Sequence, residues 1–159
     1  MHTTMRYWLM KSEPEEFSID DLERVGVEPW SGVRNYQARN FMRDGMRIGD
    51  GILFYHSNCA EPGVVGLAEV RSEAYPDPTQ FERRSDYYDP ASTREAPRWL
   101  LVDVGFRRKF ERTVTLAELK DREELGDFAL TRRGNRLSVL PVTRAQWTFI
   151  LSLEKKGKP

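Results

Sequence analysis

The chain has little of the side-chain chemistry on which enzymes and metal proteins depend. It contains one cysteine, Cys59, and two histidines, His2 and His56. One cysteine cannot form an internal disulfide, and a cysteine-based zinc site needs several thiolates. A nucleophile needs an adjacent base to activate it, and only His56 lies away from the N-terminus. The sequence therefore predicts no metal site, no cofactor and no catalytic residue.

Long apolar runs are absent as well. No stretch approaches the roughly 18 consecutive apolar residues of a membrane span, and the N-terminus lacks the apolar run of a signal peptide. We therefore expect no membrane association, and a cytoplasmic protein in a bacterium or a nuclear one in a eukaryote. A domain of about 150 residues buries enough surface to need no staple. We expect a single domain over 1–159, with its core within 5–153, and assume a monomer.

Charge of one sign is not in excess, because 25 basic side chains balance 25 acidic ones. A net charge of zero argues against bulk attraction to a polyanion, so the distribution matters more than the sum. The basic side chains gather in three groups: Arg34, Arg39, Arg43 and Arg47; Arg107, Arg108, Lys109 and Arg112; and Arg132, Arg133 and Arg136. Solvated surface ion pairs would explain any one group, but three groups together favour a partner lined with phosphates.

Short apolar runs between turn residues predict about five strands. They cover 7–10, 52–57, 64–70, 99–106 with an extension to 111, and 137–140, where Pro141 would end the pairing. Capping residues predict helices over 19–25, 36–43, 116 onward and 144–153, the last two opened by capping boxes, and a further helix over 123–130. Residues 75–97 hold four prolines and indicate a long, functional loop. Without a βαβ rhythm, this order indicates an α+β domain around a curved or barrel-forming sheet.

The most informative stretch is Trp30-Ser31-Gly32-Val33-Arg34-Asn35, taken together with Lys11-Ser12-Glu13 upstream. It sets a large flat aromatic beside a small hydroxyl, a glycine and two side chains rich in hydrogen-bond donors. Such a set can stack on a planar ring and test its polar edge. A nucleobase is such a ring, because every base has a face to stack on and an edge to hydrogen-bond.

Several motifs in one order carry a family resemblance. They are YWLMKSEP (7–14), WSGVRNYQARN (30–40), FYHSN (54–58), GLAEV (66–70), PRW (97–99) and RLSVLPV (136–142). These motifs resemble the EVE domain family in its short bacterial form. The resemblance implies a PUA-like fold, in which small helices flank a curved, barrel-forming mixed sheet, close to YTH and ASCH domains. It also implies non-catalytic recognition of a modified base in DNA or RNA, with the base flipped into an aromatic pocket.

The relation to YTH domains, which read a methylated adenine, implies roles for single residues. Trp30 would be one wall of an aromatic cage, stacking on the base with roughly 1–3 kcal/mol. Ser12, Glu13 and Ser31, with nearby backbone groups, would address the base edge, and Lys11 would belong to the same pocket. YTH domains have a neutral amide where Glu13 stands, and a carboxylate accepts but does not donate unless protonated. Glu13 therefore favours a base with an amino or N–H group, such as a cytosine derivative.

Other positions in the predicted pocket have two interpretations. Asn35 and His56 are candidates for it with Ser57, although Asn35 would also serve as a helix cap and His56 as a hydrogen-bonded buried side chain. The second wall should come from the long loop, with Tyr88, Phe81 and Tyr75 as candidates. Trp8, Trp99 and Trp147 fit apolar patterns of the core. The expected phosphate contacts are Arg34, Arg39, Arg132, Arg133 and Arg136, with Arg34 also able to hold its loop through backbone carbonyls.

A second class of function stays open on the sequence alone. The same pocket could serve a small-molecule or nucleotide-binding module, or a protein-interaction module. Salt separates the classes, because neutralising several phosphates makes affinity fall steeply with salt, whereas a neutral small ligand shows little change.

Overall fold

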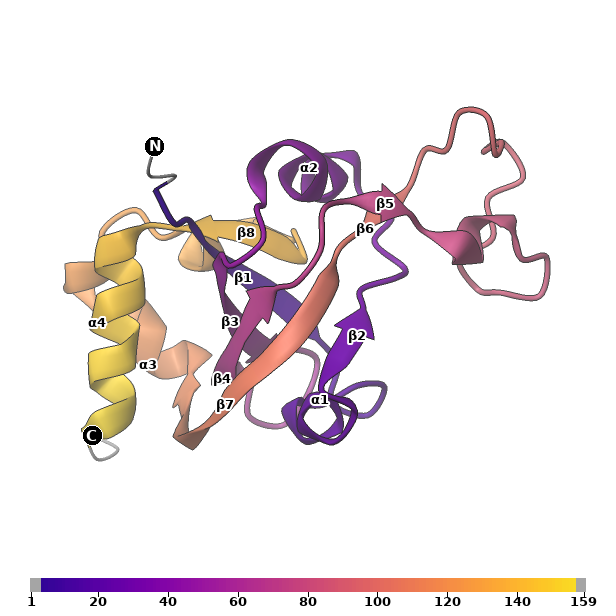
Figure 1. Cartoon of the computed structure of the whole chain (residues 1–159). Coiled ribbons are helices and arrows are strands. Elements are labelled where there is room, and N and C mark those ends of the chain that lie inside the picture. The colour runs from indigo at the N-terminus through magenta and orange to yellow at the C-terminus, as the bar shows by residue number, and fades with distance from the viewer. Residues whose placement is uncertain (1–3, 157–159) are drawn as a thin grey trace.

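A curled, six-stranded mixed sheet forms the centre of the computed structural model, which describes residues 4–156 (Figure 1). Its strands are β1 (Tyr7–Ser12), β2 (Val27–Pro29), β3 (Gly51–His56), β4 (Gly63–Val70), β7 (Asp103–Thr115) and β8 (Val139–Val142). They lie in the order β2-β7-β4-β3-β1-β8, with β1 and β3 parallel and the other neighbours antiparallel. The expected curved mixed sheet with small flanking helices is confirmed.

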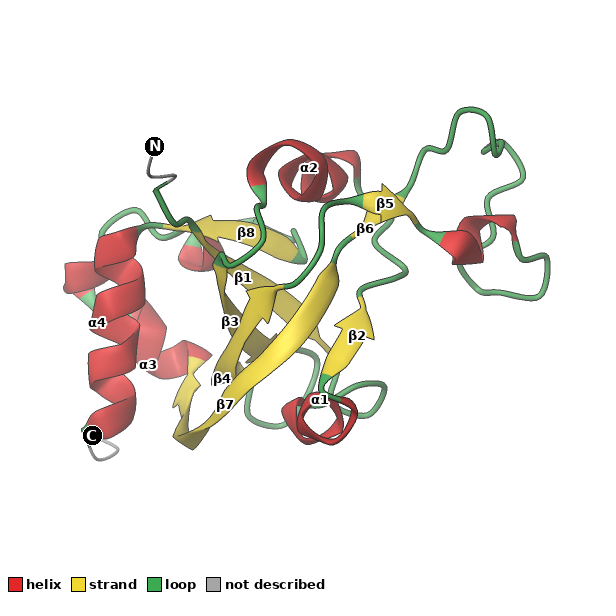
Figure 2. Cartoon of the chain, viewed as in Figure 1, coloured by secondary structure: helices red, strands yellow, loops and turns green. Residues whose placement is uncertain are grey.

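The helices are short and lie around the sheet rather than between its strands (Figure 2). The α-helices of the described residues are α1 (Ile19–Val25), α2 (Tyr36–Asn40), α3 (Leu116–Lys120) and α4 (Arg144–Lys155). A π-helical turn (Phe41–Gly45) continues α2, and single 3-10 turns cover Pro78–Phe81, Glu123–Leu125 and Ala129–Thr131. No helix within residues 4–156 is long and apolar enough to cross a membrane.

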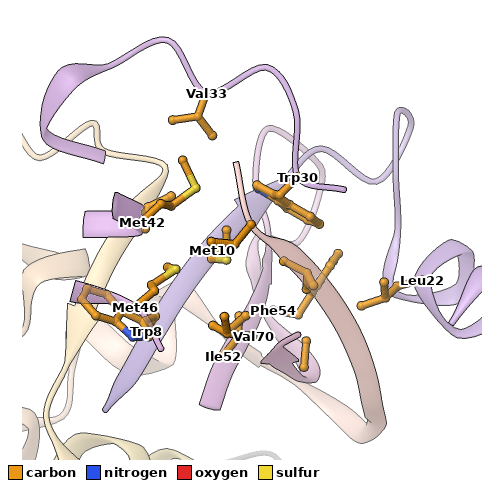
Figure 3. Close-up of a cluster of buried hydrophobic side chains, with 14 of the residues drawn as sticks. Trp8, Met10, Leu22, Trp30, Val33, Met42, Met46, Ile52, Phe54 and Val70 are labelled. Carbon is orange, nitrogen blue, oxygen red and sulfur yellow. The ribbon is translucent and has the colours of Figure 1, made fainter. Parts of the chain in front are cut away.

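Two hydrophobic clusters pack on opposite faces of the sheet. Side chains alternate along a strand, so Trp8 and Met10 of β1 join one cluster and Leu9 joins the other. The first cluster also takes in buried residues of α1 and the α2 region (Figure 3). The second takes in α3 and α4, including Trp147. Trp8, Trp99 and Trp147 are all buried, as expected for core residues.

Local chemistry explains most helix starts. Ser18 and Asp21 form a reciprocal capping box at α1, and Thr143 and Gln146 form the predicted one at α4. The box predicted at Thr115 is only half made: its side chain accepts from the Glu118 backbone, while the Glu118 carboxylate instead binds Arg112.

Several boundaries differ from the prediction. The strand expected from 99 to 111 is divided into a short strand, Leu100–Leu101, and β7, which runs to Thr115, and β2 was not predicted. The helix expected over 123–130 is two 3-10 turns, because Gly126, with φ +60°, interrupts it. The helix after Asn35 is α-helical only to Asn40. The last strand begins at Val139 and includes Pro141, which pairs with Trp8. Proline is tolerated there because β8 is an edge strand of the sheet.

The long loop is an ordered arm that projects from the sheet beyond β5 (Tyr75–Pro76) and β6 (Leu100–Leu101), which pair with each other (Figure 1). The fully buried Gln80 ties it together. Its side-chain nitrogen donates to the Asp77 and Trp99 carbonyls at 2.7 and 2.8 Å, and its oxygen accepts from the Ser92 hydroxyl at 2.6 Å. The two ends of the arm are therefore fixed to each other.

Candidate functional site

A cavity of about 540 Å³ opens where the end of β1, the segment from β2 to α2 and the tip of the arm meet. Six of the nine residues predicted for the base pocket line it: Lys11, Ser12, Glu13, Trp30, Ser31 and Ser57. Of the predicted phosphate contacts, Arg34 and Arg136 line it too. Ligand pockets typically measure about 300–1,000 Å³, so the cavity is large enough for a base or a small ligand.

Trp30 belongs both to the core and to the cavity wall. Its side chain is 8% exposed, and it packs edge-to-face against Phe17 and Phe54 at centroid distances of 6.1 and 5.6 Å. Figure 3 shows its indole beside Met10 and Phe54 in the first core cluster. These contacts fix the plane of the ring, so the part that faces the cavity is a rigid aromatic surface.

The ends of β1 and β3 supply the polar edge of the cavity. The two strands are parallel, and the Ser57 backbone N–H donates to the Ser12 carbonyl at 3.0 Å. The Ser12 hydroxyl donates to the Phe17 carbonyl at 2.5 Å, which leaves its oxygen free to accept. Burial lowers the pKa of the Lys11 ammonium. Ser12 and Ser57 therefore bring two hydroxyl residues to the cavity, whereas the ammonium of Lys11, which also lines it, lies 6.0 Å over the Tyr55 ring.

Glu13 already has a partner. The Asn58 side chain donates to its carboxylate at 2.7 Å, from a residue with φ +51° in the turn after β3. This bond ties the segment after β1 to the turn after β3.

Arg34 fastens the arm to the cavity. Its guanidinium donates to the Asp77 carboxylate at 3.0 Å, to the Thr79 hydroxyl at 3.1 Å and to the Tyr87 carbonyl at 2.7 Å. The Gly32 backbone N–H donates to the same Asp77 oxygen at 2.8 Å. Burial acts to raise the pKa of the Asp77 carboxyl, but hydrogen bonds from Thr79, Gly32 and Arg34 outweigh it, so the pKa is lowered.

The aromatic residue that the arm brings to the cavity is Tyr87. Its ring lies against Gly32, which has no side chain to obstruct it: a Cβ on Gly32 would stand 2.7 Å from the Tyr87 ring. The three candidates Tyr88, Phe81 and Tyr75 are not among the lining residues. Tyr75 instead donates to Asp103 at 2.6 Å, and Phe81 lies under the Arg94 guanidinium at 4.6 Å. Sequence reasoning missed Tyr87, and the only signal for it was its place beside Tyr88 in the loop.

Asn35 and His56 lie outside the cavity lining. The Asn35 side chain caps α2 by accepting from the Ala38 backbone at 3.0 Å. His56 accepts from the Ile19 backbone N–H at 3.1 Å, and burial lowers the pKa of its imidazole. Both side chains thus hold the starts of helices next to the cavity.

The predicted phosphate contacts differ in what they already bind. Arg39 donates to the Arg98 carbonyl at 2.8 Å and stacks over Tyr36, and Arg132 pairs with Asp127 at 2.8 Å. Arg133 and Arg136 are exposed and make no side-chain hydrogen bond or ion pair with the described part of the chain. No group of three or more potential metal ligands occurs within residues 4–156.

The curled mixed sheet with small flanking helices defines a PUA-like domain, with a cavity lined by aromatic and polar residues. The chain belongs to the EVE domain family, whose model matches residues 6–153. It is 46% identical to human thymocyte nuclear protein 1 over 169 residues, which cover 94% of this chain and 74% of that protein.

Solved structures agree with this assignment. A crystal structure of a Pseudomonas syringae protein has a TM-score of 0.90 at 50% identity, covering 93% of this chain and 99% of the other. Human THYN1 protein in complex with 5-methylcytosine-containing DNA has a TM-score of 0.91 at 45% identity, covering 96% and 99%. The resemblance seen in the motifs and the PUA-like fold that it implied are confirmed.

Proposed function

We propose that this protein recognises a modified cytosine in DNA without catalysis, with the base turned out of the duplex into the cavity. The observation that carries the proposal is the meeting of Trp30 and Tyr87 with the polar ends of β1 and β3 in one cavity. The human relative whose structure contains 5-methylcytosine DNA supports a modified base as the ligand.

The concave shape of the site supports base flipping. The edge and face of a paired base cannot both reach a concave cavity while the base stays in the stack. Unstacking costs a few kcal/mol, and stacking on an aromatic side chain returns roughly 1–3 kcal/mol per base. Trp30 and Tyr87 would supply the aromatic surfaces, and Ser12, Ser57 and Lys11 would address the base edge.

Arg136 is the first candidate for a phosphate contact. Its exposed side chain lines the cavity and has no partner in residues 4–156, and the equally unpaired Arg133 lies three positions before it. Arg132 would add charge to the same loop, beside its ion pair with Asp127. Arg34 and Arg39 are already bonded within the chain, so we propose that they shape the site rather than hold phosphates.

The test compares two neighbouring tyrosines in a fluorescence-anisotropy titration with duplexes that carry one 5-methylcytosine or one cytosine. Tyr87→Ala should weaken binding of the modified duplex roughly 5- to 150-fold, the equivalent of one stacked base. Tyr88→Ala is the matched control and should bind as the unaltered protein does, because its ring lies outside the cavity lining. Equal binding by both variants and the unaltered protein would exclude this cavity as the base site.

Trp30 needs a gentler change. Trp30 is a core residue, so Trp30→Ala should lower the free energy of unfolding by about 3–5 kcal/mol. A loss of binding by that variant could then reflect unfolding. Trp30→Phe keeps an aromatic core residue, so a loss of affinity by a folded Trp30→Phe protein reports on the wall itself.

A free nucleotide or other small ligand in the same cavity is the second candidate, favoured by the cavity's size. Salt dependence of the titration separates the two, because only a DNA ligand gives a steep negative slope. RNA oligonucleotides in the same assay test whether the partner is DNA alone. We further propose that residues 1–159 act as one monomeric unit, cytoplasmic in a bacterium or nuclear in a eukaryote.

A further inference from the structure

The cavity contains one partly buried carboxylate without a hydrogen-bond or ion-pair partner within residues 4–156, that of Glu28. Glu28 lies on β2 and lines the cavity, half-buried; its backbone pairs with Val104 of β7, but its carboxylate makes no hydrogen bond or ion pair within residues 4–156. Burial raises the pKa of its carboxyl. A desolvated carboxylate without a donor is unfavourable, and a ligand that brings a donor relieves that cost.

Strand geometry places Glu28 on the same side as Trp30. The antiparallel pairing of β2 with β7 continues one step past Pro29, because the Trp30 N–H donates to the Val102 carbonyl at 3.0 Å. Side chains two positions apart on a strand point to the same face, about 6–7 Å from each other. A ring stacked on Trp30 would therefore present its edge within reach of Glu28.

The other charged groups of the cavity are less suited to this task. Glu13 already accepts from Asn58, and Glu16 is exposed. The Arg34 donors are taken by the arm. Arg136 lines the same space and is not bonded to Glu28, and the Lys11 ammonium lies 6.0 Å over the Tyr55 ring.

We propose that Glu28 is a specificity-determining residue of this site, accepting a hydrogen bond from the exocyclic amino group of the bound base. The inference rests on the proposed function and deepens it. Glu28 would select bases with an exocyclic amino group, such as cytosine and its 5-substituted derivatives, against bases that present a carbonyl at the same position. The inference also moves the edge-reading carboxylate from Glu13, where the motif had placed it, to Glu28.

The experiment uses a matched pair of bases. Thymine carries the same 5-methyl group as 5-methylcytosine but has a carbonyl in place of the amino group, so the two differ at the atom that Glu28 would contact. Duplexes with either base, opposite the same partner base, are titrated with the full-length protein and with Glu28→Gln. The unaltered protein should prefer 5-methylcytosine. Glu28→Gln should narrow that preference about ten-fold, because an amide can donate to the thymine carbonyl as well as accept.

Glu23→Gln is the control, since Glu23 is exposed on α1 and outside the cavity, and it should keep the full preference. Thermal unfolding of each variant checks that it is folded. A folded Glu28→Gln protein with the original preference overturns the inference and leaves the proposed function standing. Absence of binding to every duplex by the unaltered protein overturns both. If Glu13→Gln narrows the preference for 5-methylcytosine over thymine and Glu28→Gln does not, the edge-reading role belongs to Glu13 and the inference is overturned.

Discussion

At the scale of single residues, Arg34 shows how hydrogen bonds fix the role of a charged side chain. A planar guanidinium offers five donors in a rigid fork, and here that fork spans a buried carboxylate, a hydroxyl and a carbonyl of the arm. The Asp77 side chain is fully buried, so its charge depends on these donors. Without these contacts to the arm, the Arg34 guanidinium would be free to bind phosphate.

Replacing Arg34 by lysine should therefore lower stability although the charge is kept. A lysine cannot span three acceptors, so we expect a loss of roughly 1–3 kcal/mol in the free energy of unfolding. Urea denaturation at neutral pH measures it. Arg24→Lys is the control, because the ion pair of Arg24 with Asp21 lies at the surface and should contribute little to stability. Equal, small effects at both positions would contradict the role given to Arg34.

Gly32 is the other residue on which the arm's position depends. Its φ of +90° is strained for other residues, and its missing Cβ leaves room for the Tyr87 ring. Gly32→Ala should destabilise by about 1–2 kcal/mol more than Gly126→Ala, which has φ +60° but no atom near the added Cβ. Urea denaturation measures both. In a Tyr87→Ala background the difference should disappear; if it persists, it does not arise from the Tyr87 contact.

At the scale of elements, two arginines of β7 hold the C-terminal half of the chain. Arg108 binds Glu154 of α4 through two bonds of 2.7 and 2.9 Å, and the Glu111 backbone N–H donates to the same carboxylate. Arg112 binds Glu118 of α3 and the Leu153 carbonyl. Arg108 and Arg112 belong to a basic group that the sequence analysis took as favouring a partner lined with phosphates. In the structure both side chains are bonded within the chain.

The bonds of the Glu154 carboxylate to Arg108 and to the Glu111 backbone predict that the protein loses stability in acid. Hydrogen bonds from Arg108 lower the pKa of the Glu154 carboxyl from its ordinary 4.5, against the opposing effect of burial. A carboxyl whose pKa is depressed by folding contributes stability that is complete above the ordinary value and is lost as pH falls through the folded value. Urea midpoints should therefore drop as pH decreases below about 4.5, the ordinary value for this carboxyl. Glu154→Gln should be less stable at neutral pH and show a shallower acid drop, whereas Glu124→Gln, on the exposed surface, should follow the unaltered protein.

At the scale of the whole molecule, the sheet separates two hydrophobic clusters, and the cavity lies on the side of only one of them. One face packs against α3 and α4, and the other against α1 and the α2 region. The cavity opens beside the second of these faces, where Trp30 belongs to both the core and the cavity wall. Changes to the α4 side should therefore alter stability with little effect on ligand preference, whereas changes around Trp30 affect both.

Several features of the fold and site could be predicted because they depend on neighbours in sequence. Capping at Ser18, Asn35 and Thr143 requires a partner only three residues away. Trp30 with Lys11, Ser12 and Ser31 lines the expected pocket. Two predictions at the same scale were wrong: at Gly126 the turn conformation interrupted the expected helix, and at Pro141 the edge position of β8 allowed the strand to continue past the expected end.

Contiguous motifs in the chain were enough to specify the family, the curved mixed sheet and Trp30 as a residue that lines the cavity. The folded arrangement was needed to establish that Tyr87 rather than Tyr88 faces the cavity, that Arg34 fastens the arm, and that Glu28 is left without a partner. Those outcomes depend on contacts such as Gly32 to Asp77 and Arg34 to Tyr87, which join residues 45 and 53 positions apart. Contacts of that range are set by how the sheet curls and how the arm closes on itself, and no local pattern in the sequence specifies either.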